Sequence, residues 1–271
     1  PESSGKTTLA LAFSRAMSMS FSRVQFTPET MPSDVVGYSM YNKETGRLEY
    51  RPGAALCNLF LADEINRTSA KTQSALLEAM EEGQVTVDGA SYPLPQPYTV
   101  IATENPLGTA GTQPLPESQL DRFMLRLSIG YPSAEQEVFI LKQTEGKRPL
   151  DSIQPAATLE DVEHMRQEAA QVYVADDLYR YVAELCTATR EDPALRLGAS
   201  PRAGVALVRA CRASAWMGGR DYIVPADINL LYYDVLEHRV ALEPQARMSG
   251  KDAHTVLEEI AAKVPAPKLV K

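Results

Sequence analysis

The chain lacks the features that mark several large classes of protein. Its 271 residues include one tryptophan, three histidines and three cysteines, and nowhere do 18 apolar residues follow one another. A membrane-spanning helix needs about 20 such residues, so no span is predicted. Cys57, Cys186 and Cys211 lie far apart in apolar segments. This placement favours reduced core thiols of a cytoplasmic protein over a disulfide framework or a zinc site.

A surplus of basic residues is also missing. The 27 lysines and arginines are outnumbered by 35 aspartates and glutamates, which gives a net charge of −8. Proteins that bind nucleic acids nonspecifically carry clustered positive charge, so the composition argues against that class. The hydrophobic fraction of 44% is that of an ordinary folded protein, and the length suffices for two small domains or one large one.

Secondary-structure patterns divide the chain into two parts. In residues 1–148, β-type runs alternate with helical patterns, which is typical of an α/β domain with a mostly parallel sheet. In residues 149–271 the strand pattern disappears, and we expect a separate all-α domain. The strands expected in the first part are Val24–Thr27, Leu59–Ala62, Val100–Thr103 and Met124–Ile129, and its helices include Thr8–Met17 and Thr72–Glu81.

Two segments interrupt this alternation and are predicted to form β-hairpins. Tyr41–Tyr50 contains a turn at Gly46, and Gln84–Tyr92 contains an Asp88-Gly89 turn between alternating apolar residues. Both are interpreted either as surface decorations or as levers that contact a substrate.

The N-terminal segment resembles a phosphate-binding loop. Pro1-Glu-Ser-Ser-Gly5-Lys6-Thr7 fits the end of the pattern G-x-x-x-x-G-K-[ST], whose first glycine would precede Pro1. In such a loop backbone N–H groups approach phosphate, a lysine adds positive charge and a threonine hydroxyl binds Mg²⁺. We expect that glycine and a strand upstream of Pro1. The predicted nucleotide-binding positions here are Ser3, Ser4, Gly5, Lys6, Thr7 and Thr8.

Two carboxylates, Asp63 and Glu64, directly follow the apolar run Leu59-Phe-Leu-Ala. Paired carboxylates at the end of a buried strand are costly unless a metal or a helix cap uses them. Asp63 is predicted to hold Mg²⁺ through water, and Glu64 to orient and deprotonate an attacking water. The alternative is a strand end that caps the next helix.

An amide side chain follows the next predicted strand. Tyr98-Thr-Val-Ile-Ala-Thr103 is followed by Glu104 and Asn105. Because the ends of parallel strands meet at one edge of a sheet, Asn105 is expected to lie near Asp63 and to fix the water opposite Glu64. Alternatively, Asn105-Pro106 is only a turn.

Taken together, these motifs resemble the MoxR family of AAA+ ATPases. The resemblance includes the segments Leu61–Arg67, Lys71–Met80 and Leu120–Phe123, and it continues through Ser200–Ala203. It implies an α/β P-loop core with a mostly parallel sheet between helices, followed by an all-α lid domain. It also implies that residues 41–50 are an insert in the second helix and that residues 84–92 form a hairpin before the first sensor.

The resemblance further implies roles for two arginines. Arg122 matches the arginine finger that completes a neighbour's site, and Arg202 matches the second sensor. From the residues alone, Arg122 could instead pair with Asp121, and Arg202 would need an anion nearby because cations are disfavoured at a helix N-terminus. Arg67 is assigned either a contact with a neighbouring subunit or a surface role.

The function implied by the resemblance is Mg²⁺-dependent ATP hydrolysis by a hexameric ring. Such a ring would act as a chaperone in remodelling, maturation or metal or cofactor insertion of a protein client, with a partner that carries a von Willebrand factor A domain. One alternative is a DNA-translocating or transcription-activating motor, which the charge of −8 disfavours. The other is a nucleotide-gated scaffold with little hydrolysis, suggested by Glu104 where the family usually has glutamine.

Overall fold

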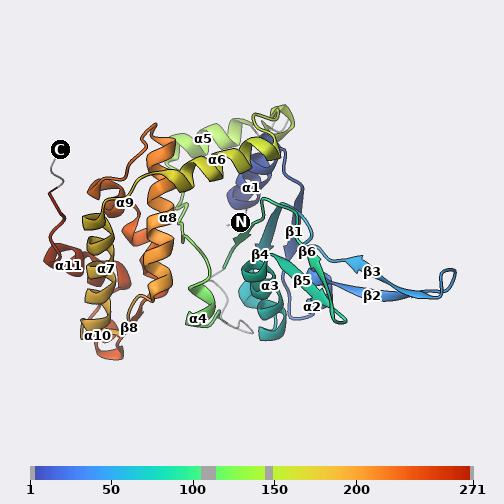
Figure 1. The fold of residues 1–271 in the computed structure, drawn as a ribbon, viewed down its shortest axis with the longest axis horizontal. Helices are drawn as coiled ribbons and strands as arrows, with labels where there is room; N and C mark the ends of the chain where they lie inside the picture. The colour runs from blue at the N-terminus through green and yellow to red at the C-terminus, as the bar shows by residue number, and fades with distance from the viewer. Residues whose placement is uncertain (1–3, 105–113, 144–148, 269–271) are drawn as a thin grey trace. The chain divides into compact units, whose positions relative to one another are not determined.

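The computed structural model describes residues 4–104, 114–143 and 149–268 (Figure 1). Contacts between Cα atoms divide the chain into two compact units. Unit 1 contains Pro1–Leu115 and Ile129–Glu163, and unit 2 contains Pro116–Ser128 and His164–Lys271. The units therefore alternate along the chain, whereas the sequence pattern predicts a single boundary between residues 148 and 149.

Unit 1 is built around a parallel sheet with the strand order β1-β4-β7 in the described part of the chain. Helices and two hairpins accompany this sheet (Figure 1). The elements are α1 (Ser4–Ala16), β1 (Phe21–Gln25), α2 (Pro32–Val36), β2 (Gly37–Asn42), β3 (Arg47–Pro52), β4 (Leu59–Asp63), the 3₁₀ helix η1 (Ile65–Arg67), α3 (Ala70–Glu82), β5 (Gln84–Val87), β6 (Ala90–Pro93), β7 (Thr99–Ala102), α5 (Ala134–Gln143) and η2 (Pro149–Ser152).

Strand β4 is the central strand, and all five of its residues are buried. A continuous apolar run of this kind is typical of a parallel strand covered on both faces. In the register, Gln25 of β1 lies opposite Asp63, and Ala102 of β7 lies opposite Ala62. The carboxyl ends of all three strands therefore meet at one edge. The strands expected near residues 24, 59 and 100 are confirmed.

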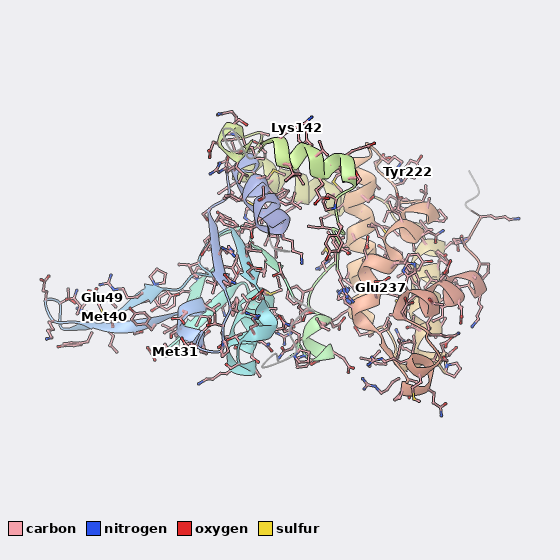
Figure 2. All side chains as sticks on the ribbon, turned by 180° about the vertical axis from the view of Figure 1, so that it is seen from behind. Met31, Met40, Glu49, Lys142, Tyr222 and Glu237 are labelled. Atoms are coloured by element: carbon pink, nitrogen blue, oxygen red, sulfur yellow. The ribbon has the colours of Figure 1, made fainter. Side chains whose placement is uncertain are left out.

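Both predicted hairpins are also present. In the second, Asp88 and Gly89 adopt φ values of 50° and 79°, the left-handed pair that a two-residue hairpin turn requires. Tyr50 of β3 stacks on Tyr92 of β6 with ring centroids 3.8 Å apart. Beyond this contact, β2 and β3 extend away from the sheet as a ribbon (Figures 1 and 2).

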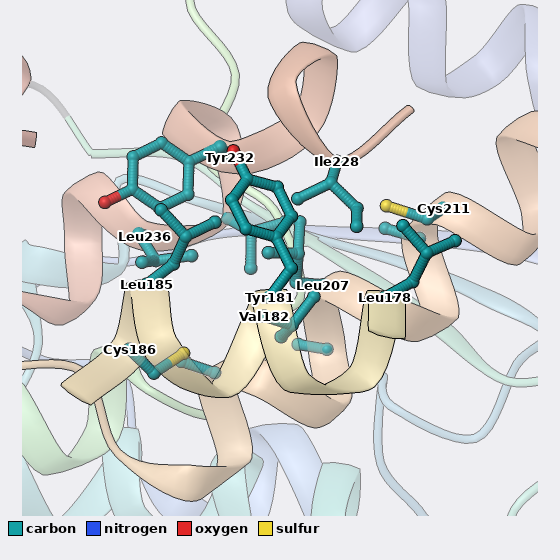
Figure 3. Close-up of a cluster of buried hydrophobic side chains, with 14 of the residues drawn as sticks. Leu178, Tyr181, Val182, Leu185, Cys186, Leu207, Cys211, Ile228, Tyr232 and Leu236 are labelled. Carbon is teal, nitrogen blue, oxygen red and sulfur yellow. The ribbon is translucent and has the colours of Figure 1, made fainter. Parts of the chain in front are cut away.

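Unit 2 is mainly helical, and α6 (Leu159–Gln171) runs from unit 1 into it. Side chains of α7, α8 and α9 form its core, as Figure 3 shows for Leu178, Leu207 and Ile228. The elements are α4 (Glu117–Leu120), α7 (Asp176–Glu191), β8 (Leu195–Leu197), α8 (Pro201–Met217), α9 (Pro225–Leu236), η3 (Glu237–Arg239), β9 (Ala241–Leu242), α10 (Pro244–Met248) and α11 (Ala253–Lys263). The expectation of a purely helical domain is corrected by one short antiparallel pair, β8 and β9.

The predicted strand Met124–Ile129 is wrong, because the structure has no strand in this described segment. Arg239 instead donates to the carbonyl oxygens of Phe123 at 2.6 Å and Met124 at 3.1 Å. The Arg126 N–H donates to the Asp234 carbonyl at 2.8 Å. These long-range hydrogen bonds take the place of a strand ladder, and they explain why residues 116–128 belong to unit 2.

Within the described ranges, no helix combines the length and the apolar character that crossing a lipid bilayer requires.

Candidate active site

Helix α1 begins at Ser4, so that Gly5, Lys6 and Thr7 form its first turn. The first N–H groups of a helix have no partner within it, and the helix dipole places positive charge there. This turn contains no acidic residue. Gly5 is exposed, and a Cβ added to it would meet no atom within 4 Å. The N-terminal end of α1 could therefore bind a phosphate group, as the sequence predicts.

Thr8 is also in this turn and is exposed. Ser4 contributes the first helical residue, whereas Ser3 lies outside the described residues.

Helix α1 packs against β4, which ends in Asp63. Asp63 is 4% exposed, and its Oδ1 accepts a hydrogen bond of 2.5 Å from the Thr103 hydroxyl. Its Oδ2 accepts two hydrogen bonds from Arg23, at 2.7 Å from Nη2 and 3.2 Å from Nε. A buried carboxylate is tolerated when hydrogen bonds and an opposite charge compensate it, and Arg23 and Thr103 provide both.

Glu64 leaves the strand in a left-handed conformation, with φ 56° and ψ 47°. Its N–H donates to the Thr103 hydroxyl at 2.9 Å. Its Oε2 lies 3.2 Å from Nε of Arg67, and the Glu64 side chain is 17% exposed. Among the described residues, the Glu64 side chain makes no capping hydrogen bond to η1. The helix-cap alternative is therefore not supported, and Arg67 is found in an ion pair within its own chain.

Arg23 and Thr103 also belong to this site, although the sequence motifs do not predict a role for either residue. Arg23 is a charged residue in the middle of β1, the strand next to the one that ends in carboxylates. Thr103 directly follows β7 and precedes Glu104, which is exposed. For Thr103, the sequence signal was a polar residue at the end of a strand predicted to lie beside the strand of Asp63. This position could have predicted a contact with Asp63. Asn105 lies outside the described residues.

The donor set suits Mg²⁺. The Thr7 hydroxyl and the Asp63 carboxylate are hard oxygen ligands, and the helix that carries Thr7 packs against the strand that carries Asp63. In the part of the chain that the structure describes, no group of three or more His, Cys, Asp or Glu could hold a metal. Mg²⁺ usually uses one or two protein ligands with phosphates and waters, so these two residues fit it.

The predicted arginines are both in unit 2. Arg122 follows α4 and Arg202 lies in the first turn of α8, and both are exposed. Asp121 accepts hydrogen bonds from Nε of Arg239 at 2.9 Å and from the Ser200 hydroxyl at 2.8 Å. Arg122 is thus joined through Asp121 to Ser200, the residue that caps α8 and precedes Arg202 by two.

Comparison with known proteins identifies the family. The family model described as ATPase family associated with various cellular activities (AAA) matches residues 2–125, and the AAA lid domain model matches residues 187–260. The chain is 37% identical over 273 residues to Chaperone MoxR1 of Mycobacterium tuberculosis, covering 97% of this chain and 72% of that protein. The chain belongs to the MoxR family of AAA+ ATPases.

Two other relatives also match nearly the whole of this chain. Protein MoxR of Methylorubrum extorquens is 31% identical, over 97% of this chain and 83% of its own length. Protein YeaC of Bacillus subtilis, which is uncharacterized, is 45% identical, over 97% of this chain and 82% of its own length.

The fold also matches a solved structure. The crystal structure of a candidate ATPase from Cytophaga hutchinsonii superposes with a TM-score of 0.91 at 37% identity, covering 98% of this chain and 83% of that one. The expected AAA+ core with a parallel sheet flanked by helices, and the helical lid region, are confirmed.

Proposed function

We propose that this MoxR-family protein is an ATP-hydrolysing chaperone that works as a hexameric ring. The observation that carries the proposal is that two adjacent carboxylates at the end of β4 differ in burial and in their contacts. Asp63 is buried, and Arg23 and Thr103 fix its carboxylate in one orientation, which supports a role as a ligand acting through water. The Glu64 side chain is 17% exposed and leaves the strand end through a left-handed backbone turn, which supports a role as the general base.

In this proposal the residues of unit 1 bind and orient the substrate. Lys6 and the N–H groups at the start of α1 bind the β- and γ-phosphates of ATP. Thr7 and Asp63 hold Mg²⁺, with Asp63 acting through water. When bound, this ion neutralises charge that develops on the phosphates. Glu64 takes the proton from the attacking water, and Asn105 helps to orient that water.

Glu64 must separate from Arg67 to act as a base. In the structure, Oε2 of Glu64 is turned towards the Arg67 guanidinium and not towards an attacking water. The ion pair of 3.2 Å therefore supports slow basal hydrolysis. This same contact favours a second candidate function, a nucleotide-gated scaffold in which hydrolysis is rare.

A ring is part of the proposal because an arginine finger acts on the nucleotide phosphates bound by a neighbouring protomer. Arg122 is proposed as the arginine finger of the neighbouring protomer's site, and Arg202 as the second sensor. Their exposure in unit 2 is compatible with both roles. The proposed functional division is an ATP-binding core in residues 1–148 and a lid domain in residues 149–271, although residues 116–128, with Arg122, belong to unit 2.

The proposed chaperone acts on a client protein. It remodels this client, matures it or inserts a metal or cofactor into it. The printed name of the Mycobacterium tuberculosis relative supports the chaperone part. The β2–β3 ribbon supports a lever role, since Met40 on β2 is exposed opposite Glu49 on β3 (Figure 2). The proposed partner carries a von Willebrand factor A domain, and the proposed location is the cytoplasm, where the buried free cysteines stay reduced.

Phosphate release by the purified full-length protein, with ATP and Mg²⁺, tests the proposal. We expect hydrolysis that depends on Mg²⁺ and on Glu64, and that DNA does not stimulate. ATP binding without phosphate release would favour the scaffold, and strong stimulation by DNA would favour a nucleic-acid motor. The β5–β6 hairpin, residues 84–93, contains no basic residue, which argues against the motor.

A further inference from the structure

Thr103 is a buried polar residue that has no role in the proposed binding of ATP or activation of water. It directly follows β7, and its side chain contacts the two residues that end β4. Its hydroxyl lies 2.5 Å from Oδ1 of Asp63 and 2.9 Å from the backbone nitrogen of Glu64. One hydroxyl group therefore touches both residues that carry the proposed catalytic carboxylates.

The direction of these two hydrogen bonds follows from the chemistry of the groups. A backbone N–H can only donate, so the Thr103 oxygen accepts from Glu64. A hydroxyl has a single proton, and an ionised carboxylate can only accept. The Thr103 proton is thus directed to Oδ1 of Asp63. The hydroxyl cannot turn elsewhere without breaking one of the two contacts.

The contact with Glu64 stabilises an unusual backbone conformation. Non-glycine residues rarely adopt a left-handed φ, because that conformation is strained for a residue with a side chain. Glu64 is held at φ 56°, and its N–H is satisfied by the Thr103 hydroxyl. This backbone turn sets the direction in which the Glu64 carboxylate leaves the strand end.

The backbone of Thr103 makes separate hydrogen bonds that do not need the hydroxyl. Its N–H donates to the Ala62 carbonyl at 2.9 Å, and its carbonyl accepts from the Ile65 N–H at 3.0 Å. Replacing Thr103 by valine would keep these bonds and the branched shape of the side chain. The role of the hydroxyl can therefore be tested apart from the pairing of the two strands.

We propose that Thr103 is a positioning residue for ATP hydrolysis, whose hydroxyl fixes the Asp63 carboxylate and the backbone of Glu64 in one arrangement. This inference rests on the proposed ATPase function. In this proposal Thr103 acts through its contacts with Asp63 and Glu64 and not by binding substrate or metal itself. Without its hydroxyl, Asp63 Oδ1 loses a donor and the Glu64 N–H loses its acceptor, so both carboxylates gain freedom to move.

The test compares Thr103→Val and Thr103→Ser with the wild type in the full chain. For Thr103→Val we expect kcat to fall on the order of 10²-fold, the loss that misplacing a catalytic group by about 1 Å can cause. The affinity for a fluorescent ATP analogue, measured by equilibrium binding, should stay within about threefold, because α1 is unchanged. The Mg²⁺ concentration for half-maximal activity should rise. Thr103→Ser restores the hydroxyl and should restore both kcat and the Mg²⁺ dependence.

Thr99→Val is the matched control. Thr99 begins the same strand, is exposed and makes its backbone hydrogen bond to Asn58. The same chemical change there should leave kcat near that of the wild type.

Three outcomes would overturn the inference. The first is wild-type kcat in a folded Thr103→Val variant. The second is a folded Thr103→Ser variant that loses as much activity as expected for valine, and this outcome decides the matter even where Thr103→Val does not fold. The third is a wild-type protein that releases no phosphate, which removes the proposed function as well. An active wild type together with a loss of activity in Thr103→Val supports both the ATPase function and the positioning role of Thr103.

Discussion

Nε of Arg67 lies 3.2 Å from Oε2 of Glu64, so the proposed general base is in an ion pair with a residue three positions further along the chain. The sequence allowed a surface role or a contact with a neighbouring subunit for Arg67. The Arg67 side chain is 44% exposed, so the pair is compatible with both roles, and we expect the arginine also to restrain the Glu64 carboxylate.

The first prediction concerns Arg67→Ala. Removing the arginine should raise the basal rate of ATP hydrolysis by up to about fivefold, the range expected when a partly exposed ion pair is lost. Steady-state phosphate release measures the effect. Arg51→Ala, which removes the arginine near Glu49 on the hairpin, is the control and should leave the rate unchanged. A fall of tenfold or more in Arg67→Ala would mean that Arg67 takes part in the reaction.

The second prediction concerns Glu64→Gln. The amide keeps the size of the side chain but cannot accept the proton of the attacking water. We expect ATP to bind with wild-type affinity while turnover falls by about 10²–10⁴-fold, the contribution typical of a positioned general base. Equilibrium binding and phosphate release, measured on the same preparation, separate the two effects. Turnover close to that of the wild type would remove Glu64 from the mechanism.

The third prediction concerns Arg122→Ala. If Arg122 completes the site of a neighbouring protomer, this variant should bind ATP and lose about 10³–10⁵-fold in rate, as arginine fingers generally do. Mixing Arg122→Ala with Glu64→Gln protomers should restore part of the activity, because some interfaces then contain both intact groups. An inactive mixture, in assemblies shown by mass to contain both variants, would assign Arg122 to its own subunit or to a structural role.

Much of the site region could be predicted because its signals are local. The continuous apolar run before Asp63 predicts a buried parallel strand, and the carboxylates that follow it predict chemistry at its end. The partners of Asp63 could not be predicted in the same way. Arg23 reaches it from β1 and Thr103 from β7, so the contacts depend on how three strands pair.

The mistaken strand at Met124–Ile129 has a similar cause. Its alternating apolar residues fit a strand pattern, but the partner that decides its structure is Arg239, more than a hundred residues away. The Arg239 side chain is 2% exposed, and a buried guanidinium needs many acceptors, which the carbonyl groups of this segment supply. A local pattern contains no information about that requirement.

The last prediction concerns pH and His238, which lies beside Arg239 in η3. Nε2 of His238 is 2.9 Å from the Phe123 carbonyl oxygen. Burial lowers the pKa of His238 to about 4, and the charges of Arg239 and Arg126 act in the same direction, while the hydrogen bond to Phe123 opposes them. In an unfolded chain the pKa of histidine is about 6.5. Above that pH the residue is neutral in both states and contributes no pH dependence.

As the pH falls from about 6.5 towards 4, the unfolded chain binds a proton that the folded protein does not, so the free energy of unfolding decreases. Between about pH 7 and about pH 5 the expected loss from His238 is about 2 kcal/mol. Denaturant titrations of His238→Gln at these two pH values should show a correspondingly smaller loss than the wild type. His164→Gln is the control, because the His164 side chain is 72% exposed, and it should behave like the wild type. Equal losses in His238→Gln and the wild type would show that the acid sensitivity of unit 2 arises from other groups.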